Sequence, residues 1–324
     1  MATQDEDGFR EAVGEDLWRE NYERALREQR TVRRRRRLAQ VTRSLPTVAV
    51  CGVLAGLTAW YLHGGSLGHV KLTAPDAAVS PRPADPPQSL VTDADLRSDP
   101  YRGTPAAKFP TRITVPAPAP IGRHGRDEVA AALAKTAHLL TVGRLDKTLL
   151  TRRDGGPYAS GLALNYRLFV YAQTQKTHDA PDGLSTLAPG QVLLAAPRVS
   201  GTMRPALGPK GELTVVTNYV FVYALVPSRP VLSREEALLS VRSDATYTFY
   251  GDRYAPGDRG AWLTAGRFYS WNVSCAPSNR GLLALPAADD IGSGHAASAR
   301  ERAAAFDPSA PAPTRDDCSN PSHN

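Results

Sequence analysis

The sequence predicts an α+β protein with an N-terminal cytoplasmic helix, one transmembrane helix, a disordered Pro-rich linker and an exported domain. Two observations predict that the exported domain has one or two helices packed on a curved antiparallel sheet. Helical periodicity is confined to the start of the domain, and the remainder of the domain is rich in β-branched and aromatic residues. Because no second helix alternates with the strands, the sheet should be antiparallel. Strands of a dozen residues usually curl, which predicts a concave face.

The transmembrane helix is predicted at Ser44–Leu62, nineteen residues without a charge. A helix of this length spans about 28 Å, close to the roughly 30 Å of bilayer hydrocarbon. Trp60 and Tyr61 lie at its far end, where aromatic rings favour the lipid–water interface. A buried core helix is the alternative interpretation. A cleaved signal peptide fits poorly, because its charged region would be 43 residues long and no small-x-small site follows the apolar run directly.

Charge predicts the orientation of this helix. Seven arginines and no acid lie between Arg30 and Arg43, whereas the next basic residues beyond the span are Lys71 and Arg82. The positive-inside rule therefore keeps the N-terminus in the cytoplasm and places the C-terminal domain outside the cell membrane. The residues that determine this topology are Arg33, Arg34, Arg35, Arg36, Arg37 and Arg43.

The same arginine block should contact anionic lipid headgroups. The formal charge of +7 is concentrated in this block, and we find no nucleic-acid recognition module. No nucleic-acid partner is therefore expected.

The cytoplasmic segment, residues 1–43, has an amphipathic helical pattern from Phe9 to Arg30. Forty-three residues cannot bury a core of their own. The helix is therefore expected to lie on the membrane or to dock to a cytoplasmic partner. Within the span, Gly52 and Gly56 form a G-x-x-x-G pair that would let two helices pack as a homodimer, although this spacing is also common in membrane helices by chance.

Residues 63–124 are predicted to be a disordered linker. Eleven prolines in residues 64–124 oppose both helix and sheet, so this segment should be disordered or polyproline-like. Such a linker would hold the exported domain away from the membrane.

The exported domain is predicted to span residues 125–287. A helix is expected over 127–140, with Asp127 at its N-cap or first turn, and Gly143 is expected to interrupt it. A short helical turn should come next, at 145–150.

The rest of the domain is predicted to be β-rich. The stretch Gly208–Gly211 is typical of a hairpin, and Gly266 is expected to form a bulge or bend. Strands are predicted at 162–174, 212–225, 239–250 and 261–275. A weaker signal at 192–203 predicts a pair of strands around Pro197.

This order of elements resembles the roll of the nuclear transport factor and cystatin-like superfamily. The stretches RDEVAAALAKTAHLLTVGRLDKTLL, VVTNYVFVYALV and FYSWNVSC are similar to uncharacterised single-pass bacterial membrane proteins that carry such a roll outside the cell. Proteins of this kind include ones associated with lipid-uptake loci and with conjugation or secretion machines. The resemblance covers about half of the chain and implies the fold of the exported domain. It implies no site residues, because no signature of the superfamily is present.

No catalytic, cofactor-binding or metal site is predicted. The seven histidines show no metal-ligand spacing, and we find no nucleophile or phosphate-binding motif. His138 is interpreted as a surface or core-edge residue rather than a general base. Asp146 is interpreted as a helix N-cap, with a catalytic carboxylate as the alternative. Asp252 and Asp258 are interpreted as turn formers.

Aromatic side chains alternate along the predicted strands, and Tyr219, Phe221 and Tyr223 share one face. Sheet core is the favoured interpretation, and a pocket for an apolar or sugar ligand is the alternative. The remaining aromatic residues in this set are Tyr247, Phe249, Phe268 and Trp271.

Cys275 and Cys318 are predicted to form a disulfide, because they are the two cysteines outside the membrane and an oxidising exterior favours pairing. A bridge that closes about 44 residues should stabilise the domain by roughly 4 kcal/mol. It would hold a low-complexity tail, 288–324, whose large apolar residues are Ile291 and Phe306. Two free thiols are the alternative.

These features favour a non-catalytic single-pass membrane protein that acts as an envelope scaffold or accessory subunit and binds a protein partner outside the membrane. The alternatives are a transmembrane sensor with a cytoplasmic partner at the N-terminal helix and a membrane-anchored surface enzyme. A cavity with convergent acids and histidines would favour the enzyme. A solid core with an exposed apolar edge would favour the scaffold.

Overall fold

The computed structural model describes residues 90–152, 154–177, 183–287 and 299–310, which belong to one compact unit beginning at Pro87. The predicted span, its arginine block, the Gly52–Gly56 pair and the cytoplasmic helix lie outside the described residues. Among the helices that the structure describes, none combines the length and the apolarity that a membrane crossing requires.

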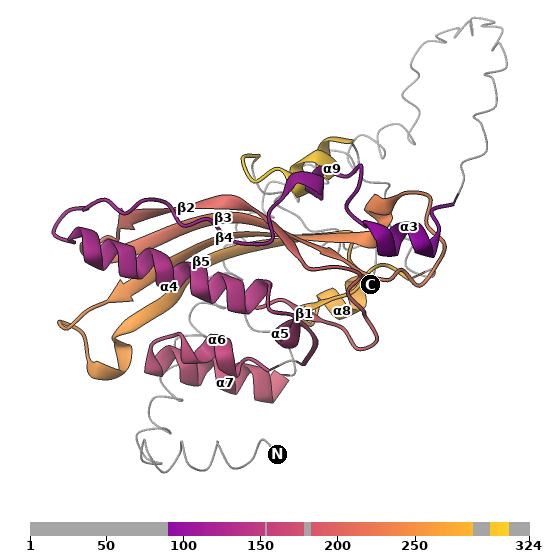
Figure 1. Cartoon of the computed structure of the whole chain (residues 1–324). Coiled ribbons are helices and arrows are strands. Elements are labelled where there is room, and N and C mark those ends of the chain that lie inside the picture. Colours follow the sequence, from indigo (N-terminus) through magenta and orange to yellow (C-terminus); the bar gives the residue numbers. More distant parts are fainter. Residues whose placement is uncertain (1–89, 153, 178–182, 288–298, 311–324) are drawn as a thin grey trace, which may run out of the picture. The chain divides into compact units, whose positions relative to one another are not determined.

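A four-stranded antiparallel sheet forms the centre of the domain, in the order β2–β3–β4–β5 (Figure 1). Its strands are β2 (Arg198–Leu207), β3 (Leu213–Ala224), β4 (Leu238–Tyr250) and β5 (Gly260–Trp271). Each strand pairs with the next one in sequence, and the predicted hairpin at Gly208–Gly211 joins β2 to β3. The predicted α+β class with a curved antiparallel sheet is therefore confirmed.

The sheet differs from the prediction in two details. The weak signal at 192–203 gives one strand, β2, that begins after Pro197, and the residues before Pro197 form only an isolated bridge, between Leu193 and Leu225. The bulge expected at Gly266 lies instead at Thr264. The register between β4 and β5 shifts there, so Thr264 has no opposing residue in β4.

Four helices lie between residues 126 and 177, ahead of the sheet, where one or two were expected. Helix α4 (Arg126–Arg144) lies across one face of the sheet (Figure 1). Asp127 lies in its first turn as predicted, but Gly143 does not interrupt it. The next helices along the chain are α5 (Lys147–Arg152), α6 (Gly156–Ser160) and α7 (Leu164–Thr177).

The prediction of a strand at 162–174 is wrong, because most of this stretch forms α7. Its apolar residues alternate as in a strand, but Leu164–Leu168 and Tyr166–Val170 are also the i,i+4 pairs of a helix. The glutamines and lysine near its end favour a helix as well.

The main hydrophobic core lies between the helices and this face of the sheet. A short parallel pair, β1 (Thr186–Leu187) and β6 (Leu282–Leu283), lies beside α5 and α8 (Cys275–Ser278). Strand β3 contributes to the main hydrophobic core the side chains of Leu213, Val215, Tyr219, Phe221 and Tyr223.

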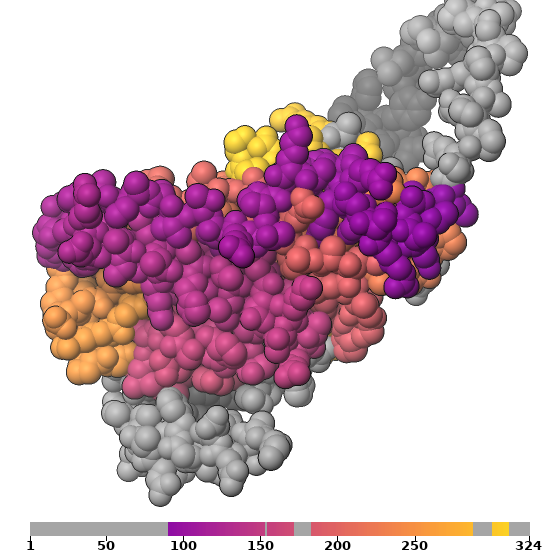
Figure 2. Space-filling view, viewed as in Figure 1, coloured from indigo at the N-terminus to yellow at the C-terminus, as the bar shows by residue number. Residues whose placement is uncertain are grey.

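The segment 90–124 belongs to the domain, which corrects the linker boundary predicted at residue 124. It contains α3 (Asp93–Ser98) and the 3-10 helix η1 (Pro105–Lys108). The Tyr101 hydroxyl lies 3.0 Å from the Ala196 carbonyl oxygen and 3.3 Å from that of Val222. In Figure 2 the indigo segment lies flush against the rest of the domain. Prolines oppose regular structure, but they do not oppose burial.

The low-complexity C-terminal tail contributes a folded element over its described residues, 299–310. Helix α9 (Ala299–Phe306) packs on the second face of the sheet beside η1 (Figure 1). The Phe306 and Trp271 rings meet edge to face with centroids 5.2 Å apart. Phe306 therefore completes a second apolar cluster on this face.

Arg242 in β4 holds the end of α9. Its side chain is 1% exposed, and its guanidinium donates to the carbonyl oxygens of Ala304 (3.0 Å), Pro308 (3.2 Å) and Ala310 (2.7 Å). Ala304 lies in the last turn of α9, where carbonyls have no partner within the helix, and the other two acceptors follow the helix end.

Candidate functional site

The acids and histidine considered from sequence are used structurally. Asp146 accepts hydrogen bonds from the backbone amides of Thr148 (2.7 Å) and Leu149 (3.1 Å), which confirms the N-cap interpretation. His138 is exposed on α4, as predicted for a surface residue. Over the described residues, no group of three His, Cys, Asp or Glu side chains is placed to hold a metal ion.

The two acids of the β4–β5 connection stabilise that turn. Asp258 belongs to the 3-10 helix η3 (Pro256–Asp258), and its carboxylate accepts a 2.7 Å hydrogen bond from Asn165 of α7. Asp252 forms an ion pair with Arg259 at 3.2 Å. The turn-former interpretation of both acids is therefore confirmed.

A buried positive charge lies in the main core. Arg144, at the end of α4, is 4% exposed, and its guanidinium donates to the Leu184 carbonyl (2.8 Å) and to Ser185 Oγ (2.9 Å). The guanidinium carbon lies 4.9 Å from the centre of the Phe268 ring, a cation–π distance. Among the described ion pairs, none joins Arg144 to a carboxylate.

Three buried tyrosines surround Arg144. The Tyr223 hydroxyl lies 2.8 Å from Ser185 Oγ and 3.0 Å from the Arg144 carbonyl oxygen. Burial raises the pKa of Tyr223 to about 12, and it also raises the pKa values of Tyr158 and Tyr247. All three hydroxyls are therefore neutral at pH 7 and can donate hydrogen bonds. This cluster holds the segment 183–187 in the core.

The aromatic residues singled out from sequence are mostly core, as the favoured interpretation predicted. Tyr219, Phe221, Tyr223 and Tyr247 are buried against the helices. Trp271 lies on the opposite face, in the cluster that α9 completes.

A row of five half-buried rings was missed by sequence reasoning. We call it the aromatic row, and it runs from α7 across the edge strand β5 to the β4–β5 connection. Neighbouring ring centroids are 4.5–6.0 Å apart along the row. Its members, in spatial order, are Phe169, Tyr166, Trp262, Tyr250 and Tyr254. The sequence signal was weak, because the rings come from a helix, two strands and a turn.

Polar contacts fix the middle and one end of the aromatic row. The Trp262 indole N–H donates to the Asp258 carbonyl at 2.8 Å, and the Tyr254 hydroxyl donates to the Glu212 carboxylate at 2.8 Å. This hydrogen bond lowers the pKa of Glu212 and raises that of Tyr254. The exposed Arg253 guanidinium lies over the Tyr254 ring at 5.2 Å. The rings are therefore held in place before any ligand arrives.

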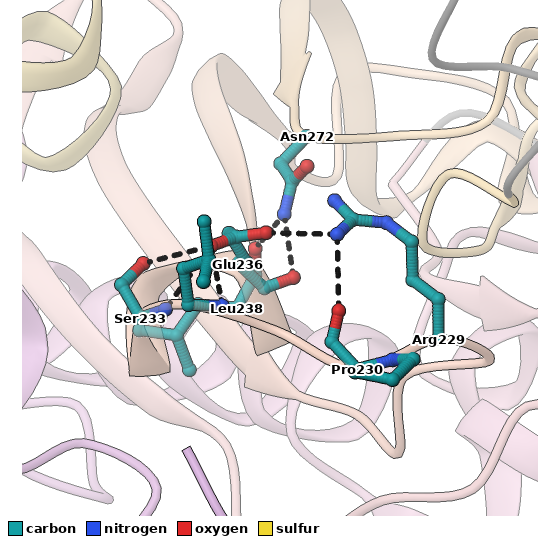
Figure 3. A network of polar contacts seen from close by, with 7 residues as sticks. Arg229, Pro230, Ser233, Glu236, Leu238 and Asn272 are labelled. Atoms are coloured by element: carbon teal, nitrogen blue, oxygen red, sulfur yellow. Dashed lines mark hydrogen bonds and ion pairs between the residues drawn. The ribbon is translucent and has the colours of Figure 1, made fainter. Parts of the chain in front are cut away.

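A second ordered region is the loop that joins β3 to β4 (Figure 3). It includes the 3-10 helix η2 (Arg234–Ala237), and Glu236 is its centre. The Glu236 carboxylate accepts hydrogen bonds from the backbone amides of Leu232 and Ser233, both at 3.0 Å, and pairs with Arg229 at 3.0 Å.

Asn272 ties this loop to the end of β5. Its side-chain amide donates to the carbonyls of Glu236 (3.2 Å) and Leu238 (2.7 Å), as Figure 3 shows. The φ angle of Asn272 is 57°, and no other non-glycine residue in the described part of the chain has a positive φ. Asparagine tolerates this conformation better than most residues, and the two hydrogen bonds offset its cost.

Cys275 is disulfide-bonded in the structure. Its predicted partner, Cys318, lies outside the described residues, so the Cys275–Cys318 pairing stays a prediction.

Comparisons of the chain with protein-family models, with curated proteins and with solved structures found no match.

Proposed function

We propose that this chain is a single-pass membrane protein that acts without catalysis, as an accessory or scaffold subunit, and that the aromatic row binds a protein partner outside the cell membrane. The anchor and its orientation come from residues 44–62 and from the arginines before them. The roll superfamily resemblance belongs to the same proposal.

The aromatic row is the observation that carries this proposal. Tyrosine, tryptophan and arginine are the residues most enriched where protein interfaces gain most of their binding energy. The row combines a tryptophan, three tyrosines and Arg253 on one partly exposed surface. Because neighbouring rings and hydrogen bonds already fix these side chains, a partner would bind with little loss of side-chain entropy.

The buried Arg144 cluster favours binding over catalysis. Burial keeps its tyrosine hydroxyls neutral, and its guanidinium already donates hydrogen bonds to the 183–187 segment. Asp146 is likewise occupied as a helix cap. These groups stabilise the domain that presents the aromatic row.

Site-specific photo-crosslinking in cells tests the proposal. Photoreactive amino acids at Arg253 and Tyr254 should give one discrete adduct each with the same partner, whereas one at Ala131, exposed on α4, should give none. The substitution Trp262→Leu should abolish both adducts while the hydrogen-exchange protection of β3 stays unchanged. Adducts that also form from Ala131, or that persist in Trp262→Leu, would exclude the aromatic row as the interface.

A further inference from the structure

Exposed apolar side chains gather at the end of the sheet where β3 leads into β4. We call these four residues the apolar rim. They are between 39% and 57% exposed, although isoleucine, leucine and valine elsewhere in the described domain are mostly buried. The apolar rim consists of Leu90, Val192, Val226 and Leu232.

The rim residues form two cross-strand pairs. Antiparallel bridges join Val91 to Val231 and Leu193 to Leu225. These bridges place Leu90 opposite Leu232 and Val192 opposite Val226, and side chains directly opposite one another project to the same side. Each pair therefore presents two apolar side chains opposite each other rather than two scattered residues.

The rim is presented rigidly. Leu232 is held through its backbone amide by the carboxylate of Glu236, the residue at the centre of Figure 3. The Val226 amide donates to the Val192 carbonyl at 2.9 Å. Single exposed apolar residues are normal on protein surfaces, but paired ones on a braced loop indicate a contact surface.

The place where the chain enters the domain points to the occupant of this surface. Leu90, a member of the rim, is the first described residue, and 27 residues (63–89) separate the domain from the predicted span. A flexible chain of that length has ends about 30 Å apart. An anchored domain would therefore keep the bilayer surface at high effective concentration beside the rim.

We infer that the apolar rim rests on the outer surface of the lipid bilayer, with its four side chains at the boundary between headgroups and acyl chains. This inference rests on the proposed membrane anchoring. The contact is hydrophobic rather than electrostatic, because Arg229 and Arg234 at this end pair with Glu236 and Asp95. Docking should therefore depend little on salt or on anionic lipid.

This orientation places the aromatic row far from the membrane. The rim lies before the start of β4, and Tyr250 and Tyr254 of the row lie at its end. A strand of 13 residues is about 40 Å long. The rim would then set the height at which the row meets its partner.

Fluorescence quenching in nanodiscs tests the inference. The full-length chain, with Cys51→Ala, receives one environment-sensitive dye at Leu232→Cys, at Val192→Cys or, as a control, at Asp252→Cys on the opposite hairpin. The nanodiscs contain phosphatidylcholine and a doxyl-labelled phosphatidylcholine, with or without phosphatidylglycerol. Quenching of about half is expected at positions 232 and 192 and none at 252, because interfacial side chains enter the bilayer by ~5–10 Å.

A second variant separates contact from proximity. Val226→Ser combined with Leu90→Ser should abolish quenching of the dye at position 192, since it removes half of the apolar rim. Unquenched dyes at 232 and 192, or equal quenching at 252, would overturn the inference while leaving the anchoring intact. Crosslinks between two copies through position 232 would also overturn it, because a second copy would then cover the rim. A cytoplasmic location of the domain would overturn both proposals.

Discussion

Replacing Arg242 with methionine should release α9 from the sheet while the rest of the domain stays folded. Arg242 donates three hydrogen bonds to carbonyls at and beyond the end of α9, at 2.7–3.2 Å. Bonds from a charged donor contribute about 1.5–3 kcal/mol each. Methionine no longer carries the cost of burying a charge, so the net loss should be smaller than their sum. We expect a local loss of about 3 kcal/mol.

Phe306→Ala should release the same helix by a different route. Phe306 is buried against Trp271, and truncating a buried phenylalanine costs about 3–5 kcal/mol. An isolated eight-residue helix is not stable in water, so α9 depends on these contacts. Once α9 has left the sheet, the other contact is already lost. The double substitution should therefore cost much less than the sum of the two single ones.

Hydrogen exchange of the peptide 299–310 in the full-length chain measures this loss. Arg302→Met serves as the matched control, because Arg302 is exposed on the same helix, and it should change protection by less than about 0.5 kcal/mol. Additive losses in the double variant, or unchanged protection in Arg242→Met, would refute the role of Arg242 as the residue that holds α9.

Three further perturbations test other parts of the structure. Gly183→Ala should destabilise the domain strongly, because φ is +93° there and a Cβ would abut the Tyr158 hydroxyl. Thermal unfolding should show a much larger loss of stability than for the control Gly190→Ala, where a Cβ would meet open space. Stability should fall as pH rises above about 10, because the folded pKa of Tyr223 (about 12) exceeds its ordinary value of 10.0 and unfolding then releases its proton. The chain has twelve tyrosines, and absorbance from the buried ones, beyond that of the exposed ones, should appear together with unfolding; ionisation of all twelve in the folded protein would contradict this. Cys275→Ser, Cys318→Ser and the double variant should lose equal stability, and unequal losses would exclude their pairing.

The parts of the fold that were predictable have strong local signals. β3 is dense in β-branched and aromatic residues, and α4 has an apolar stripe from Val129 to Leu140. Asp146 as a helix cap was also predictable, because its hydrogen bonds reach only two and three residues along the chain.

The parts that were missed depend on contacts between distant residues. Composition suggested a linker at 90–124, yet Tyr101 is buried against carbonyls some 95 and 121 residues away. The docking of α9 depends on Arg242, about 60 residues upstream. Local patterns carry no information about such partners.

The candidate site was missed for the same reason. The aromatic row joins Tyr166 of α7 to Trp262 of β5, and α7 itself was predicted as a strand because its apolar residues fit both periods. A row assembled from separate elements shows in the sequence only as isolated aromatic residues.

The orientation of the chain in the membrane is the most direct test of the central claim. A reporter that is active only in the cytoplasm is fused at Met1 in one strain and at Asn324 in another. The proposed anchoring predicts activity from the fusion at Met1 and none from the fusion at Asn324. Activity at Asn324 would place the domain inside the cell and contradict the account of an external subunit.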